Sequence, residues 1–163
     1  MITLSFETKS RVPMQDFKYQ SVIPARVMDV FSFHHDLNNL KKISKGVQID
    51  VLSVEGNMKK GTIITLLIKK WFLKTIWQLE IIDHQPNQSF SDLQTKGPFR
   101  YWKHTHIFQK EGEQTLLIDR VEYQLGFFPF LWPAEKWLMK WIFMHMFKKR
   151  HELTRQIFQK RSP

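Results

Sequence analysis

The chain has 163 residues, of which 42 % are hydrophobic and 25 % charged, and this length and composition suit one domain with a core rather than a disordered chain. It contains no cysteine, which excludes disulfides, thiolate metal sites and cysteine nucleophiles. The net charge of +10 favours anionic partners such as nucleic acid or a membrane surface.

The sequence shows no targeting or membrane-spanning signal. Residues 1–7 have no basic region followed by an apolar run, as a secretory signal would. The most apolar stretch, residues 125–147, is interrupted by prolines and charges at mid-span. We therefore expect one domain over residues 1–163 in the cytoplasm, free or associated with a membrane surface.

The first third of the chain predicts strand, then helix. Apolar residues alternate over residues 2–6 and again over 17–23, which is the period of a strand. Pro24 suits the first position of a helix. The apolar face of that helix would hold Val27, Val30, Phe31 and His34. A second short helix is expected over residues 38–43, before Gly46.

The rest of the chain predicts a series of strands and one long helix. Strands are expected over residues 47–54, 62–68, from 74 onward, 90–94, 99–110 and 114–123, and the helix over 133–160. This order predicts an α+β fold, in which a curved antiparallel sheet of about seven strands wraps round the C-terminal helix. Such a fold tends to leave a cavity between sheet and helix.

The hairpin of residues 99–123 holds the candidate site. A turn at Glu111–Gly112 would pair His104 with Asp119. Lys103, Arg120 and Glu122 require solvent, so the opposite face points inward. The residues expected to line the interior are Trp77 and Leu79 of the strand from 74, with Trp102, His104, His106, Phe108, Asp119, Val121 and Tyr123 of the hairpin.

Three interpretations of these polar groups stay open. His104 and Asp119 form a buried hydrogen bond and nothing more, they bind a hydroxyl, carbonyl or phenol of a ligand, or Asp119 orients His104 as a catalytic base. No nucleophile motif, phosphate loop or cofactor motif accompanies them, so we expect no cofactor.

A metal site would need more than the two histidines. His104 and His106 share one face of a strand and offer two ligands, whereas zinc needs a third and usually a fourth. His34, His35 or Asp36 would have to supply one, and no spacing supports this. We expect no metal.

The long helix mixes aromatic residues with cations. Its stripe toward the sheet is predicted to be Met139, Ile142, Met146, Leu153 and Ile157. The other side carries Trp137, Lys140, Trp141, Met144, Phe147 and Lys148. One interpretation is that flanking strands bury these tryptophans. The other is that residues 126–147 contact a partner, which would be an anionic membrane, a second copy of the chain or another protein. Nucleic acid is a further possible partner, but the sequence contains no nucleic-acid-binding motif.

The chain also resembles a known group. The pattern Phe90-x-Asp92-x-Gln94-x-x-Gly97-Pro98-Phe99-x-x-Trp102-x-His104-x-His106-x-Phe108, followed by Asp119-x-Val121-x-Tyr123, is similar to that of bacterial SRPBCC proteins. These are START-like helix-grip domains often labelled cyclase/dehydrase. Residues 24–40 resemble the group's first helix pair. The resemblance departs after Leu125, where the Phe- and Trp-rich loop and helix are unlike the family.

The resemblance implies a seven-stranded sheet gripping a long helix over a hydrophobic cavity. Members bind lipids, polyketides, quinones or plant hormones, and a minority are aromatase/cyclase enzymes. We expect a domain that binds a hydrophobic small molecule or lipid. The alternatives are a cyclase or dehydratase using the His104–Asp119 pair, and a membrane-surface or protein-interaction domain using residues 126–147.

Overall fold

The protein is represented by a computed structural model, and the structure describes residues 13–125 and 132–160. Its elements in chain order are β1 (Gln15–Ile23), α1 (Val27–His35), α2 (Leu37–Ile43), β2 (Gln48–Glu55), β3 (Ile63–Lys70), β4 (Leu73–Gln85), β5 (Ser89–Lys96), β6 (Tyr101–Glu111), β7 (Gln114–Gln124) and α3 (Trp132–Gln159).

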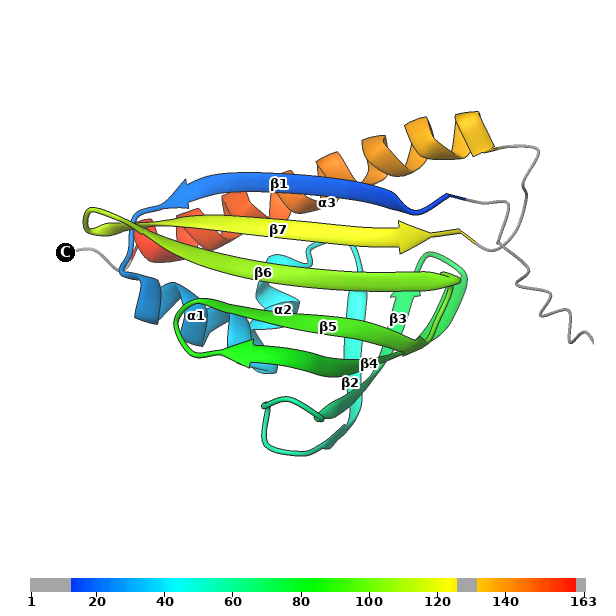
Figure 1. Cartoon of the computed structure of the whole chain (residues 1–163), viewed down its shortest axis with the longest axis horizontal. Coiled ribbons are helices and arrows are strands. Elements are labelled where there is room, and N and C mark those ends of the chain that lie inside the picture. The colour runs from blue at the N-terminus through cyan, green and yellow to red at the C-terminus, as the bar shows by residue number, and fades with distance from the viewer. Residues whose placement is uncertain (1–12, 126–131, 161–163) are drawn as a thin grey trace, which may run out of the picture.

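The seven strands form one antiparallel sheet in the order β1-β7-β6-β5-β4-β3-β2. The strands β2 to β7 follow one another in sequence order, and β1 pairs with β7. The chain passes through α1 and α2 between β1 at one edge of the sheet and β2 at the opposite edge. The helix α3 runs along the sheet next to β1 and β7 (Figure 1). The predicted α+β architecture and its two short helices after the first strand are confirmed.

The first elements differ from the prediction in detail. The helix α1 begins at Val27 with Arg26 as its N-cap, so Pro24 is not its first residue. Residues 23–25 instead form a turn, in which Ala25 donates to the Ile23 carbonyl, and Thr115 donates to the carbonyl of Ala25. Because these bonds hold residues 23–25 in a turn, the helix begins at Val27, three residues after Pro24. The strand β1 begins at Gln15, and the strand expected over residues 2–6 lies outside the described residues.

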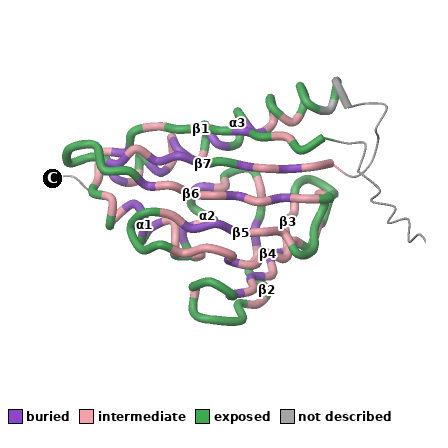
Figure 2. The backbone as a smooth tube through the Cα atoms, in the orientation of Figure 1, coloured by how far each residue is buried: buried purple, intermediate pink, exposed green. Residues whose placement is uncertain are grey.

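The face of α3 that packs against the sheet is aromatic. Its buried residues are Phe143, Phe147, His151, Thr154 and Phe158, which recur at three- and four-residue spacing (Figure 2). The prediction for this helix was therefore wrong at two positions. Phe147 points inward and stacks on Phe17 of β1 at 5.6 Å, whereas Met146 is exposed. The helix is rotated from the predicted stripe because a fully buried phenylalanine removes more apolar surface from water than methionine at the edge.

No helix within the described residues has the length and hydropathy required to cross a membrane.

Candidate functional site

The β6–β7 hairpin positions most of the candidate residues. Its turn is Gly112–Glu113, so Glu111 pairs with Gln114, and the predicted pairing of His104 with Asp119 is wrong. His106 lies opposite Asp119, and His104 lies opposite Val121. Gly112 has φ +61°, which fits the first position of a tight turn, where glycine is favoured.

The predicted faces of the hairpin nevertheless hold. The register differs from the prediction by two residues, and a shift of two keeps every side chain on its face. The expected inward residues of the hairpin are all buried: Trp102, His104, His106, Phe108, Asp119, Val121 and Tyr123. On the outer face, Lys103 pairs with Glu122 at 3.2 Å and Arg120 with Asp16 at 2.8 Å.

Asp119 lies at the centre of the site and contacts three imidazoles. Its Oδ1 accepts a hydrogen bond from His104 Nε2 at 3.0 Å, and His106 Nδ1 lies 2.6 Å from the same oxygen. Its Oδ2 accepts from His151 Nε2 of α3 at 2.7 Å. The site thus joins two strands to the C-terminal helix. Sequence reasoning missed His151. The only feature that could have indicated its role is a polar residue within the apolar stripe of a helix.

These contacts determine which ring nitrogens carry protons. A carboxylate only accepts, so the Nε2 atoms of His104 and His151 are the donors. In neutral His151, Nδ1 then accepts from the hydroxyl of Ser21, whose Oγ is 2.7 Å away. In neutral His104, Nδ1 carries the lone pair and can accept a proton or a hydrogen bond.

The charge of the site is concentrated on Asp119. Burial alone would raise the pKa of this carboxyl, but His106 and the hydrogen bonds from the imidazoles outweigh burial and hold the pKa well below its usual value. Burial and the neighbouring His104 lower the pKa of His106 to about 3. At neutral pH the site therefore holds an ionised Asp119 beside a neutral His106.

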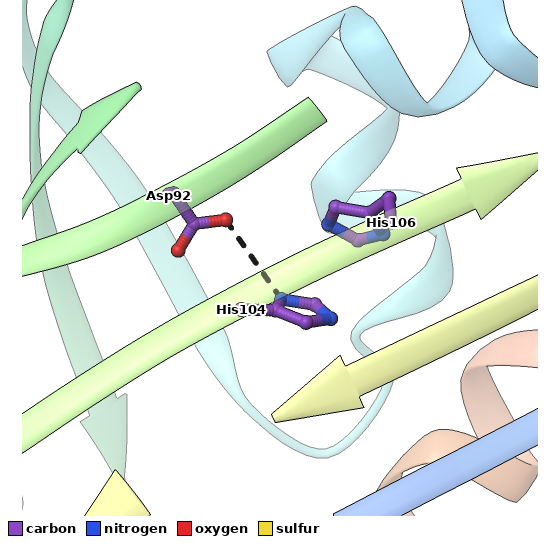
Figure 3. A group of neighbouring side chains, drawn as sticks. All are labelled: Asp92, His104 and His106. Atoms are coloured by element: carbon purple, nitrogen blue, oxygen red, sulfur yellow. Dashed lines mark ion pairs between the residues drawn. The ribbon is translucent and has the colours of Figure 1, made fainter. Parts of the chain in front are cut away.

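A second carboxyl, Asp92 of β5, approaches His104 from the other side (Figure 3). Its Oδ2 is 3.8 Å from His104 Nδ1, too far for a direct hydrogen bond. Its Oδ1 is buried and has no partner in the described part of the chain. Burial is the main cause of a raised pKa at Asp92. Sequence reasoning quoted Asp92 only within the family pattern, although it shares the inward face of β5 with Phe90.

Asp92, His104 and His106 are also the residue types that bind metals, and their ligand atoms lie within 4.8 Å of one another. Of the three residues considered as a further ligand, His35 and Asp36 are engaged elsewhere. His35 Nε2 lies 2.6 Å from the Met58 carbonyl, and Asp36 caps α2. His34 lies beside His106, with ring centroids 5.8 Å apart.

The apolar candidates divide between two core clusters on either side of the polar residues. Phe108 packs with Phe31 of α1 at a ring distance of 5.3 Å. Trp102, Val121 and Tyr123 belong to the cluster around Phe143 of α3. Trp77 and Leu79 of β4 are half-buried at the edge of that second cluster, and Trp77 contacts Trp102 at 5.0 Å.

The Gly97–Pro98–Phe99 turn is held by Gln94. The Gln94 amide donates to the Phe99 carbonyl at 2.6 Å and accepts from the Phe99 N–H at 3.4 Å. A Cβ at Gly97 would fall 2.9 Å from the Trp77 ring and closer still to the Gln94 amide. This part of the family pattern positions the start of β6 rather than the polar site itself.

The outer side of α3 is exposed. Trp137 and Trp141 have 75 % and 61 % of their surface accessible, so flanking strands do not bury them. Lys140, Met144 and Lys148 are exposed on the same helix. Residues 126–131 of the proposed contact segment lie outside the described residues.

Comparison with known proteins identifies the family. Residues 23–150 match the sequence profile of a family described as polyketide cyclase/dehydrase and lipid transport. The chain belongs to this family. A comparison with curated protein sequences gave no match.

Solved structures of low sequence identity share the fold. TTHA0849 from Thermus thermophilus is 20 % identical, with a TM-score of 0.73 over 91 % of this chain and 100 % of its own. The Zhui aromatase/cyclase from Streptomyces sp. R1128 is 12 % identical, with a TM-score of 0.74 over 93 % and 97 %. Norcoclaurine synthase from Thalictrum flavum, in complex with dopamine and hydroxybenzaldehyde, is 11 % identical, with a TM-score of 0.71 over 100 % and 98 %.

Proposed function

We propose that this family member binds a hydrophobic small molecule or lipid between the sheet and α3, and that Asp92 and His104 receive the ligand's polar group. The observation that carries the proposal is the 3.8 Å separation between Asp92 Oδ2 and His104 Nδ1. Burying a polar atom without a partner costs about 1–3 kcal/mol. The unpartnered Asp92 Oδ1 therefore favours a ligand group or water that completes the site.

The charges at this position select the chemistry of that group. Asp119 is ionised, and Asp92 is a second carboxyl on the other side of His104. A carboxylate or phosphate brought between them would be repelled. A hydroxyl would instead donate to Asp92 or to the lone pair of His104 Nδ1, and a carbonyl would accept from Asp92 in its protonated form. Trp102 and Val121 would supply apolar walls, with Trp77 and Leu79 at the edge and Phe108 and Tyr123 behind them.

Native mass spectrometry of the purified protein tests this first, since a carried ligand appears as added mass. Protein stripped of lipid is then titrated with 1-hexadecanol and with palmitate, and tryptophan fluorescence is followed. We expect saturable binding that is tighter for the alcohol. His104→Gln should weaken it about ten-fold, and Lys103→Gln on the outer face should leave it unchanged. No added mass together with no saturable binding of either probe would refute the proposal.

A second candidate is an enzyme of cyclase or dehydratase type, favoured by the 3.0 Å contact between His104 Nε2 and Asp119. Asp119 would orient the ring, and His104 Nδ1 would take a proton from a substrate carbon or hydroxyl. In that case His104→Gln should abolish turnover of a polyketide-like substrate while affinity is kept. A binding protein should show the reverse, with weaker affinity and no turnover to lose.

A further inference from the structure

We infer that the tip of the β3–β4 hairpin, Trp71 and Phe72, inserts into the interfacial region of an anionic phospholipid membrane. These residues connect the two strands as a two-residue turn closed by the Lys70–Leu73 pair. With 85 % and 87 % of their surface accessible, they are the most exposed large hydrophobic side chains of the described chain. Two neighbouring aromatics in water are unfavourable unless something covers them.

The backbone at the tip is unfavourable for a bulky aromatic residue. Trp71 has φ +54°, in the left-handed region that bulky side chains rarely adopt. It occupies the first position of a two-residue turn, where a positive φ is normally supplied by glycine. A strained, exposed tryptophan at this position points to a binding role for its ring.

Cations surround the tip. Lys70 places Nζ 5.1 Å from the centre of the Trp71 ring, and Lys74 is exposed on the following strand. Neither lysine forms an ion pair in the part of the chain that the structure describes, whereas Lys69 pairs with Asp50. Tryptophan next to lysine is typical of protein surfaces at the boundary of an anionic bilayer, where each cation contributes about 1 kcal/mol.

A second aromatic surface lies at the same end of the molecule. The β3–β4 tip is at the end of the sheet where β5 ends and β6 begins, and α3 starts beyond that end (Figure 1). The first half of α3 carries the exposed Trp137 and Trp141 with Lys140 between them. A bilayer is the partner that contacts separate protrusions at once, because its surface is continuous and adapts to their spacing. This favours lipid over a second copy or a nucleic acid.

Vesicle sedimentation of the full chain tests the inference. Vesicles of phosphatidylcholine with 30 % phosphatidylserine are compared with pure phosphatidylcholine, with Trp71→Gly as the test variant. The matched control is Asn87→Gly, which relieves a similar positive φ of +59° at the β4–β5 turn, at the opposite end of the sheet. We expect Trp71→Gly to lower the partition coefficient about ten-fold while the Tm stays equal or rises, and Asn87→Gly to leave partition unchanged.

Charge is tested separately with Lys70→Gln plus Lys74→Gln, which should weaken binding to the anionic vesicles by about five-fold per lysine and leave binding to neutral vesicles unaltered. Trp71→Gly binding as tightly as the wild type would overturn the inference. So would a lower Tm in Trp71→Gly, since the ring would then support the fold. Self-association that Trp71→Gly abolishes, without vesicle binding, would reassign the tip to a second copy. All measurements use lipid-stripped protein, so they stand apart from the proposed interior ligand.

Discussion

His151 of α3 donates through Nε2 to Asp119 Oδ2 of β7, and this 2.7 Å hydrogen bond joins two fully buried side chains that are 32 residues apart. It is the polar contact that ties the C-terminal helix to the centre of the sheet. On its other side the same ring meets Ser21 of β1. The orientation of α3 over the polar site therefore depends on one imidazole with both nitrogens engaged.

Removing that imidazole should destabilise the fold. His151→Ala leaves a cavity and deprives the ionised Asp119 of one of its three partners, and we expect a loss of about 3 kcal/mol in the free energy of unfolding. Urea denaturation measures it. Arg155→Ala, on an exposed position of the same helix, serves as the control and should stay within about 0.5 kcal/mol of the wild type. Equal losses for the two variants would contradict the role given to His151.

Stability should decrease as the solution becomes acidic. Burial lowers the pKa of His106 to about 3 and that of His34 well below its usual value, whereas both titrate near 6.5 in the unfolded chain. Below pH 6.5 the two histidines are therefore protonated in the unfolded state but not in the native state. As a result, the free energy of unfolding falls by about 1.4 kcal/mol per pH unit for each histidine. For His106 this loss continues down to about pH 3.

Urea titrations between pH 7 and 5 check this dependence. His106→Gln should reduce the slope of the free energy of unfolding against pH by about 1.4 kcal/mol per pH unit, because one proton fewer is bound on unfolding. Asp92 acts in the opposite direction, because its raised pKa makes the native state bind a proton before the unfolded state does, at pH values above 3.8. Asp92→Asn should therefore make the free energy of unfolding fall more steeply with acid in the pH range between the raised native pKa of Asp92 and 3.8. A slope that neither variant changes would show that other groups control the acid transition.

The two faces of α3 should respond very differently to truncation. Phe147→Ala removes a fully buried ring that stacks on Phe17, and should cost about 3–5 kcal/mol. Trp137→Ala removes a larger ring from solvent and should change stability by less than about 0.5 kcal/mol. Thermal unfolding of both variants measures the difference, and a large loss in Trp137→Ala would show that this tryptophan is covered.

Gly97 should resist substitution for steric reasons alone. An alanine Cβ would displace the Gln94 amide, which is held by its hydrogen bond to the Phe99 carbonyl, so Gly97→Ala should cost about 1 kcal/mol or more. In a Gln94→Ala background the same change should cost less, because the obstructing amide is gone. A double-mutant cycle measures this coupling, and additive effects would locate the obstruction at Trp77 instead.

Strand periodicity predicted much of this site because it is a local property. Alternation along β6 and β7 placed His104, His106 and Asp119 on one face, and that assignment survived an error of two residues in the pairing. The error itself arose at the turn, where Gly112 takes the first position rather than the second.

The amino-acid sequence by itself determined the α+β class, the order of the elements and the inward face of the hairpin, since each follows from residues close together in the chain. Only the tertiary structure decided which groups meet. Asp92 reaches His104 because β5 pairs with β6, and His151 reaches Asp119 because α3 crosses the sheet with Phe147 inward. Contacts between distant segments depend on packing and helix rotation, which a one-dimensional pattern does not contain.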